Sequence, residues 1–241
     1  MGKLPVINFR KKLKGIYKLG FIESLRSGNT GIGKTLEDLF GIPENNVSND
    51  FQFEGRIIEL KSQRATASSR VTLITKSPHW NPLSAEKIIR KYGYSDAKGR
   101  QGLKVTITAV DFNTHRLKLE INKPLNRINI IHKKNGAVCY FEIKELMGKI
   151  KEKLSQNLLI VFAETRKKRR KEQFHYTEAY FLSDLSEENF EQLLLDGVIV
   201  WEFRMHIKEN GSVRDHGAGF RISEKHLPEL YSAKEKIKMD F

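Results

Sequence analysis

The chain has 241 residues, of which 39% are hydrophobic and 30% charged, as in a globular protein with a full hydrophobic core. No apolar run reaches the ~18–20 residues that a membrane-spanning helix needs, and the first residues lack the apolar segment of a signal peptide, so we expect a cytoplasmic protein. Lysine and arginine total 43 against 29 acidic residues; the resulting charge of +14 favours a nucleic-acid partner. The single cysteine, Cys139, excludes an intramolecular disulfide and a cysteine-rich zinc site.

The first third of the chain is predicted to pass from helices into strands. Apolar residues at helical spacing indicate a helix over residues 9–26, and a second helix is expected from 34 to 40, before a glycine. Beyond residue 51 the pattern is that of strands, which we place at 56–62 and 70–76. A serine cap and a terminal glycine then delimit a helix over 84–93.

The remainder of the chain reads as mostly antiparallel strands with a few helices. Two hairpins are predicted, one over 103–122 turning near Asn113 and one over 127–143 turning at Asn135-Gly136. The other expected elements are a helix over 143–156, strands over 157–164, 174–182 and 198–207, a helix over 187–195 and a last helix near 224–237. The result is a mixed α/β (α+β) chain rather than an alternating βαβ one.

The segment GNTGIGKT, residues 28–35, matches the pattern of a nucleotide-binding P-loop. A P-loop also needs a buried strand running into its glycines and a long helix leaving them. Here the preceding residues look helical and the helix that follows is short. We therefore expect no nucleotide triphosphate at this motif. Its glycines are expected to make a loop that delivers Glu37 to a site.

The stretch IIELK is more informative, because Glu59 and Lys61 are two residues apart on a predicted strand and so face the same side. In a metal-dependent nuclease, such a carboxylate binds Mg²⁺ and the lysine positions the attacking water. A second carboxylate must come from upstream, where Asp50 and Glu54 are available. Taken alone, the motif also fits a surface Glu–Lys pair on an edge strand.

Three segments appear in order within fifty residues: GNTGIGKTLEDLFG, NDF followed by IIELKSQR, and VTLITKSP. Together with LLIVFAETRKKRRKEQFHYTEAYFLSDL and DHGAGFRI, they resemble the MvaI/BcnI family of type II restriction endonucleases, which is related to the mismatch-repair nicking enzyme MutH. The resemblance extends over most of the chain. It implies a PD-(D/E)xK restriction-endonuclease core, MutH-like, with a cleft that grips duplex DNA.

The resemblance also implies a set of catalytic residues. Glu59 and Lys61 match the ExK half of the family's motif, and Glu37 matches its accompanying helix carboxylate. For the first acidic ligand we prefer Asp50, although it lies nine residues before Glu59 where the family has five; Glu54 has that spacing but a different residue type and remains the alternative. Asp50 and Glu59 would bind Mg²⁺, for which Mn²⁺ can substitute. Lys61 would contact the water and the scissile phosphate.

A second set is implied to bind DNA. Asp215, His216 and Arg221 match the family's recognition segment, and Arg204 resembles a position that reads guanine. Where the BcnI-like branch of the family carries histidine, this chain has Thr75, as the MvaI branch does. Where both branches carry histidine, it has Arg214, so the central base pair of a CCNGG-type site stays open. The residues expected to bind DNA are Thr75, Lys76, Arg204, Arg214, Asp215, His216 and Arg221.

We accordingly predict a single endonuclease chain over residues 1–241, with a catalytic lobe mainly in 1–165 and a recognition lobe mainly in 166–241. The expected partners are double-stranded DNA and a cognate DNA methyltransferase of a prokaryotic host, with no membrane and no second copy of the chain. The alternatives are a MutH-type repair nickase and a DNA-binding module without catalysis. The basic run RKKRRK, residues 166–171, is read as contacting phosphates or as simply solvated.

Overall fold

The computed structural model describes residues 4–43, 49–66 and 70–240, which divide into two compact units. The first unit comprises 1–69, 151–186 and 227–241, and the second comprises 70–150 and 187–226. Both units are therefore assembled from segments distant in the chain. Residue 165, near which we predicted the division into lobes, lies within a strand of the first unit, Asn157–Lys168, which is paired along its whole length with the strand Lys171–Leu185.

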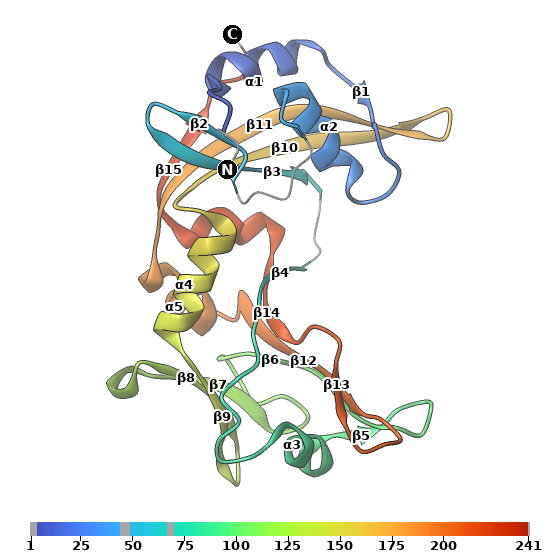
Figure 1. Ribbon diagram of the computed structural model, residues 1–241, viewed down its shortest axis with the longest axis vertical. Coiled ribbons are helices and arrows are strands. Elements are labelled where there is room, and N and C mark those ends of the chain that lie inside the picture. The colour runs from blue at the N-terminus through green and yellow to red at the C-terminus, as the bar shows by residue number, and fades with distance from the viewer. Residues whose placement is uncertain (1–3, 44–48, 67–69, 241) are drawn as a thin grey trace. The chain divides into compact units, whose positions relative to one another are not determined.

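The first unit is built on a six-stranded sheet (Figure 1). Its order is β1 (Ile22–Glu23), β11 (Lys171–Leu185), β10 (Asn157–Lys168), β3 (Arg56–Arg64) and β2 (Phe51–Phe53), with β15 (Tyr231–Ile237) also paired to β11. Strands β3 and β10 are parallel and the other pairs antiparallel. The sheet thus combines a parallel centre with antiparallel edges, as expected for a mixed α/β core.

Two helices pack on this sheet and close its core. Helix α1 (Phe9–Lys18) buries Phe9, Leu13 and Ile16, while α2 (Gly31–Phe40) buries an apolar stripe that includes Leu36 and Phe40. Helix α1 ends well before the predicted residue 26, because the chain turns at Gly20 with φ +65°, a conformation that favours glycine. Helix α2 ends at Gly41, as predicted, in a left-handed C-cap.

The second unit contains two further sheets (Figure 1). The larger has the order β4 (Arg70–Thr75), β14 (Gly219–Ser223), β12 (Ile199–Ile207), β6 (Gln101–Ile107) and β5 (Tyr94–Ser95), with β13 (Val213–Asp215) on β12. The smaller is the meander β7 (Leu117–Asn122), β8 (Arg127–His132) and β9 (Gly136–Glu142). The helices are α3 (Ala85–Tyr92), α5 (Glu187–Leu195) and α4 (Ile143–Leu154), the last of which continues into the first unit.

Two predicted elements are wrong. Residues 103–122 do not form a hairpin, because β6 pairs with β5 and β12 whereas β7 pairs with β8. The last helix is also absent: residues 224–230 form a 3₁₀ helix containing Pro228, and the segment after it is the edge strand β15. The helix-favouring residues of β15 are overridden by its backbone pairing with β11. None of the helices in the described residues is long and apolar enough to cross a membrane.

Candidate functional site

The hairpin of β2 and β3 places the first candidate carboxylate. Its two turn residues, Glu54 and Gly55, have φ values of 50° and 75°, which match the twist of a tight hairpin. The hairpin brings Asp50 across from β3, where the Asp50 N–H donates to the carbonyl of Ile58 at 3.0 Å. The Asp50 carboxylate accepts the N–H of Leu60 through Oδ2 at 2.7 Å. Asp50 is therefore held by the backbone on both sides of Glu59.

Glu59 and Lys61 lie on an inner strand, since β3 is flanked by β2 and by β10. Ile58 and Leu60 point into the apolar core, so the alternating Glu59 and Lys61 share the opposite face, as predicted. Their side chains form an ion pair in which Glu59 is 13% and Lys61 41% exposed. The other Glu59 oxygen accepts the backbone N–H of Asn49 at 3.1 Å. The carboxylate is thus largely buried and oriented while the ammonium reaches solvent.

The charges around Asp50 identify the rest of the cluster. Burial raises the pKa of Asp50 to about 6, against the opposing hydrogen bond from Leu60. The negative charges of Glu59 and Glu37 raise this pKa further, and Lys61 lowers it. Glu37, carried by α2, therefore lies near enough to Asp50 to repel it. The structure brings together four of the five predicted catalytic side chains: Glu37, Asp50, Glu59 and Lys61.

Glu54, the alternative to Asp50, lies elsewhere. It is exposed in the β2–β3 turn, and its charge acts on Arg10 of α1. It is not among the groups whose charges shift the pKa of Asp50. The five-residue spacing to Glu59 therefore places Glu54 at the hairpin tip rather than in the cluster.

The donor set of this cluster fits a hard cation that keeps most of its water. In the described residues no three Asp, Glu, His or Cys side chains are arranged to hold a metal ion by themselves. Mg²⁺, however, is usually bound through one or two carboxylates, with water completing the shell. Asp50 and Glu59 can supply two such carboxylates, and a cation would relieve the repulsion that raises the pKa of Asp50.

The P-loop-like segment does not form a P-loop. Residues 31–35 of the motif are already the first turn of α2, and the strand before it, β1, has two residues. A Cβ at Gly31 would overlap the carbonyl oxygen of Arg26 and the hydroxyl of Ser24. The Leu25 N–H donates to Thr35 Oγ1 at 3.1 Å. The motif thus packs the preceding loop tightly against α2, the helix that carries Glu37.

Most of the predicted DNA-binding residues meet on one sheet of the second unit. Thr75 of β4 lies opposite Gly219 of β14, which in turn lies opposite Glu202 of β12. Arg204 lies opposite Lys104 of β6. We call this surface the polar sheet face and define it by Thr75, Lys104, Glu202, Arg204, Arg214 and His216.

Glu202 is the centre of an ion-pair network on this face. It accepts a hydrogen bond from Nε of the exposed Arg204 at 3.1 Å and forms an ion pair with Arg221, whose Nε lies at 2.7 Å. Arg221 is buried and also donates to Thr72 Oγ1 at 2.6 Å and to the carbonyl of Gly217 at 3.1 Å. The guanidinium of Arg204 is therefore exposed to solvent, while the buried Arg221 fixes the position of the Glu202 carboxylate.

His216 is oriented by a relay of polar contacts. Asp96 binds Arg100 at 2.7 Å, the guanidinium of Arg100 lies 3.4 Å from Nε2 of His206, and His206 Nδ1 lies 3.0 Å from His216 Nε2. An arginine can only donate, so His206 accepts at Nε2 and carries its proton at Nδ1. Nδ1 then donates to His216 Nε2, which assigns the proton of the neutral His216 ring to its own Nδ1. Burial and the charge of Arg100 lower the pKa of His206 and keep it neutral.

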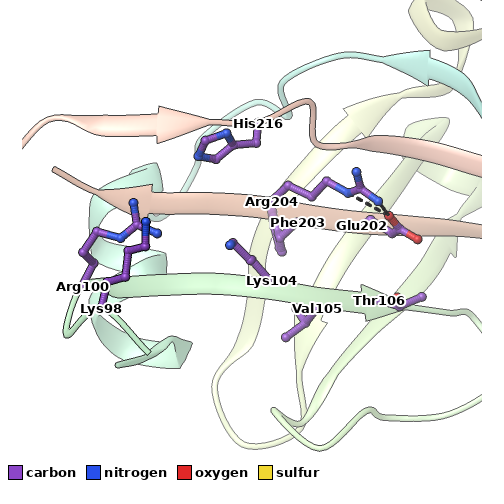
Figure 2. A pocket seen from close by; sticks show the side chains of 9 residues that line it. All are labelled: Lys98, Arg100, Lys104, Val105, Thr106, Glu202, Phe203, Arg204 and His216. Carbon is purple, nitrogen blue, oxygen red and sulfur yellow. Dashed lines mark hydrogen bonds and ion pairs between the residues drawn. The ribbon is translucent and has the colours of Figure 1, made fainter. Parts of the chain in front are cut away.

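A cavity of about 730 Å³ opens on this face (Figure 2). It is lined in part by cations that were not among the DNA-binding residues predicted from the sequence. Lys98, Arg100 and Lys104 come from the β5–β6 connection and β6, and line it together with Arg204 and His216 (Figure 2). Their spacing in AKGRQGLKV carries no motif. The one available signal was the basic residues clustered around two glycines, which indicate a tight turn.

The remaining predicted residues have separate positions. Arg214 is exposed on β13 opposite His206. Asp215 is exposed too, but one of its oxygens accepts the Ala218 N–H at 2.7 Å and so shapes the turn before β14. Lys76 is half-buried and ion-paired with Glu145 of α4, whose pKa is lowered by that bond.

A largely buried carboxylate and a lysine on an inner strand, beside a carboxylate just before the preceding hairpin strand, define the class of PD-(D/E)xK nucleases. A model of the MvaI/BcnI restriction endonuclease family matches residues 10–231, and the chain belongs to that family. It is similar to the solved structure of restriction endonuclease MvaI with cognate DNA substrate, at 27% identity and a TM-score of 0.66, covering 95% of this chain and 97% of that one. MvaI without DNA matches at 25% identity and 0.64, covering 95% and 96%. No curated protein sequence matches.

Proposed function

We propose that this restriction endonuclease cleaves double-stranded DNA at a short C/G-rich site of CCNGG type, with Mg²⁺ or, in its place, Mn²⁺. The observation that carries the proposal is the cluster of Asp50, Glu59 and Lys61, with Glu37 beside it, on the sheet of the first unit. The similar MvaI structure with its cognate DNA supports duplex DNA as the substrate. We further propose that the chain acts as a monomer in a prokaryotic cytoplasm, alongside a cognate methyltransferase.

The residues of the cluster would divide the work of hydrolysing a phosphodiester, with Glu37 supplying a further carboxylate to the metal or its waters. Asp50 and Glu59 would hold the metal ion, which supplies charge stabilisation and a more acidic water when bound. Lys61 reaches solvent from its pair with Glu59, so its ammonium can hold the attacking water and neutralise a phosphate oxygen. The backbone N–H groups of Leu60 and Asn49 keep the two carboxylates oriented toward the same place.

The polar sheet face would read the bases. Arg204 is exposed and offers two parallel donors, the pattern that pairs with guanine in the major groove. The Nδ1–H that the relay assigns to His216 is a further donor for a base-edge acceptor. Thr75 and Arg214, of which only Arg214 departs from both branches of the family, are the residues we expect to decide the central base pair.

The test is digestion of unmethylated plasmid DNA with and without Mg²⁺, followed by sequencing of the ends. Discrete fragments that share one C/G-rich site support the proposal. Lys61→Ala and Asp50→Ala should abolish cleavage, while Glu54→Ala should cleave normally because its side chain lies at the hairpin tip. DNA binding without cleavage in either metal would instead support a non-catalytic module. Cleavage of one strand only at hemimethylated sites would support a MutH-type nickase.

A further inference from the structure

A second basic cavity lies in the first unit and is not part of the cluster of carboxylates. Its volume is about 550 Å³, and it is enclosed by the loop after β1, the end of β3 and the hairpin of β10 and β11. Five cations line it: Arg26, Arg64, Lys167, Arg170 and Lys171. Two carboxylates, Glu23 and Glu172, share the wall.

The wall of this cavity is held in shape by specific contacts. Arg64 forms a two-pronged pair with Glu172, with both distances 2.9 Å, and Lys171 is paired with Glu23. The Ser24 N–H donates to the carbonyl of Glu172 at 2.9 Å and ties the loop to β11. The cavity is therefore a formed feature of the fold and more than a patch of solvated lysines.

The basic run of residues 166–171 forms the tip of the β10–β11 hairpin, and only some of its side chains line the cavity. Arg169 and Arg170 have φ values of 48° and 67° and make the tight turn between β10 and β11. Arg166 stacks on Phe21, with its guanidinium carbon 3.9 Å from the ring centre. Lys167 and Arg170 line the cavity, whereas Lys168 and Arg169 do not. In the part of the chain that the structure describes, neither Lys167 nor Arg170 has a carboxylate partner.

We propose that this cavity binds a backbone phosphate of the DNA just outside the recognition sequence. The inference rests on the proposed function and extends it to the flanking duplex. Arg64 lies on β3, the strand that also carries Glu59 and Lys61, so the cavity is attached to the end of that strand. Arg64 is three residues beyond Lys61, which separates their Cα atoms by about 10 Å at about 3.3 Å per residue and turns their side chains to opposite faces of the sheet.

The two carboxylates favour a singly charged phosphodiester over a free polyphosphate. Glu23 and Glu172 already neutralise Lys171 and Arg64, so the charges of Lys167 and Arg170 suit one singly charged phosphate. A nucleotide triphosphate would bring several negative charges against the same two carboxylates. The cavity accordingly positions DNA and carries no sequence information, as is usual for phosphate contacts.

The test compares two double variants of the same hairpin, Lys167→Ala/Arg170→Ala and Lys168→Ala/Arg169→Ala. Both remove two exposed cations, but only the first pair lines the cavity. Binding is measured without divalent metal over a salt series, on a duplex extending about one turn (~10 bp) beyond the cleavage site and on one trimmed to that site. Each phosphate contact contributes about 0.9 to the slope of log K against log salt.

We expect the cavity variant to lose about 0.9 in slope and roughly tenfold in affinity on the long duplex, and little on the trimmed one. The matched variant should lose clearly less on the long duplex. Equal losses from both variants, or equal losses on both duplexes, would overturn the proposal while leaving the nuclease assignment intact. A wild-type chain that binds neither duplex would overturn both.

A small-anion site is a separate outcome of the same comparison. Pyrophosphate and ATP are tested by thermal shift on the wild type and on the cavity variant. A stabilisation that only the wild type shows, with an unchanged DNA salt slope, would replace the DNA assignment by a polyphosphate site. The variant Lys167→Arg/Arg170→Lys keeps both charges. A salt slope equal to that of the wild type in this variant would show that the loss in the alanine variant comes from charge and not from the fold of the hairpin.

Discussion

Arg221 and Glu202 form a nearly buried ion pair at 2.7 Å, with side chains 11% and 14% exposed. Removing one partner of such a pair leaves a charge with little solvent to replace it. Arg221→Leu should therefore lower the free energy of unfolding by about 2–4 kcal/mol, measured by urea denaturation. Arg204→Ala, which removes the exposed partner of Glu202, should lower it by less than about 1 kcal/mol.

The double variant Arg221→Leu/Glu202→Leu separates the pair from its surroundings. If Arg221→Leu lowers the stability because the Glu202 carboxylate is left without its partner, the double variant should be more stable than Arg221→Leu alone. A double variant that is less stable than either single one would show that packing around Thr72 and Gly217 dominates.

Asp50 should make the stability of the metal-free protein depend on pH. Its pKa is about 6 in the folded chain and near 3.8 in the unfolded one, so between these values the folded state binds more protons. Stability then falls as the pH rises through this range. The Asp50→Asn variant should not show that fall. Its melting temperature should be several degrees above that of the wild type at pH 7, and the difference between the two melting temperatures should be smaller at pH 4. The exposed Asp38→Asn on α2 is the matched control, and an identical pH profile for it and Asp50→Asn would contradict the assignment.

The relay to His216 should matter for discrimination between bases. Arg100→Met frees His206 to hold its proton on either nitrogen, so His216 no longer presents a single donor pattern. We expect the ratio of cleavage at the preferred site to cleavage at a one-base variant to drop about tenfold, since a base contact contributes about 1–3 kcal/mol. Lys98→Met, which removes a cation from the same cavity but not from the relay, should weaken cleavage at both sites alike.

Alanine substitutions at two glycines should change the free energy of unfolding in opposite directions. A Cβ at Gly219 would overlap the carbonyl oxygen of Ile74 between β14 and β4, so Gly219→Ala should destabilise the chain by about 1–3 kcal/mol. Gly148 lies exposed in α4 with open space around it, and Gly148→Ala should stabilise by up to about 1 kcal/mol. Chemical denaturation of both variants checks the pair, and a stable Gly219→Ala would show that β4 moves freely against β14.

The sequence by itself determined the elements whose signal is local. The helix ending at Gly41, the helix capped by Ser84 and the strand with Glu59 and Lys61 on one side all follow from short-range patterns, and the structure has them in place. Cys139 lies in the apolar run GAVCYFEI, a pattern typical of a buried strand, and it is buried; burial raises the pKa of this thiol, so it stays unreactive. The family resemblance was readable because several such segments occur in a fixed order.

Only the tertiary structure decided which segments meet. Residue spacing favoured Glu54 over Asp50, but a two-residue turn sends Glu54 to the hairpin tip and folds Asp50 back onto Leu60. Strand β15 carries helix-favouring residues and is a strand because β11 offers it backbone partners. Lys104 joins Arg204 through cross-strand register alone. Such pairings depend on backbone hydrogen bonds between residues up to a hundred positions apart, and these leave no mark on either segment's own pattern.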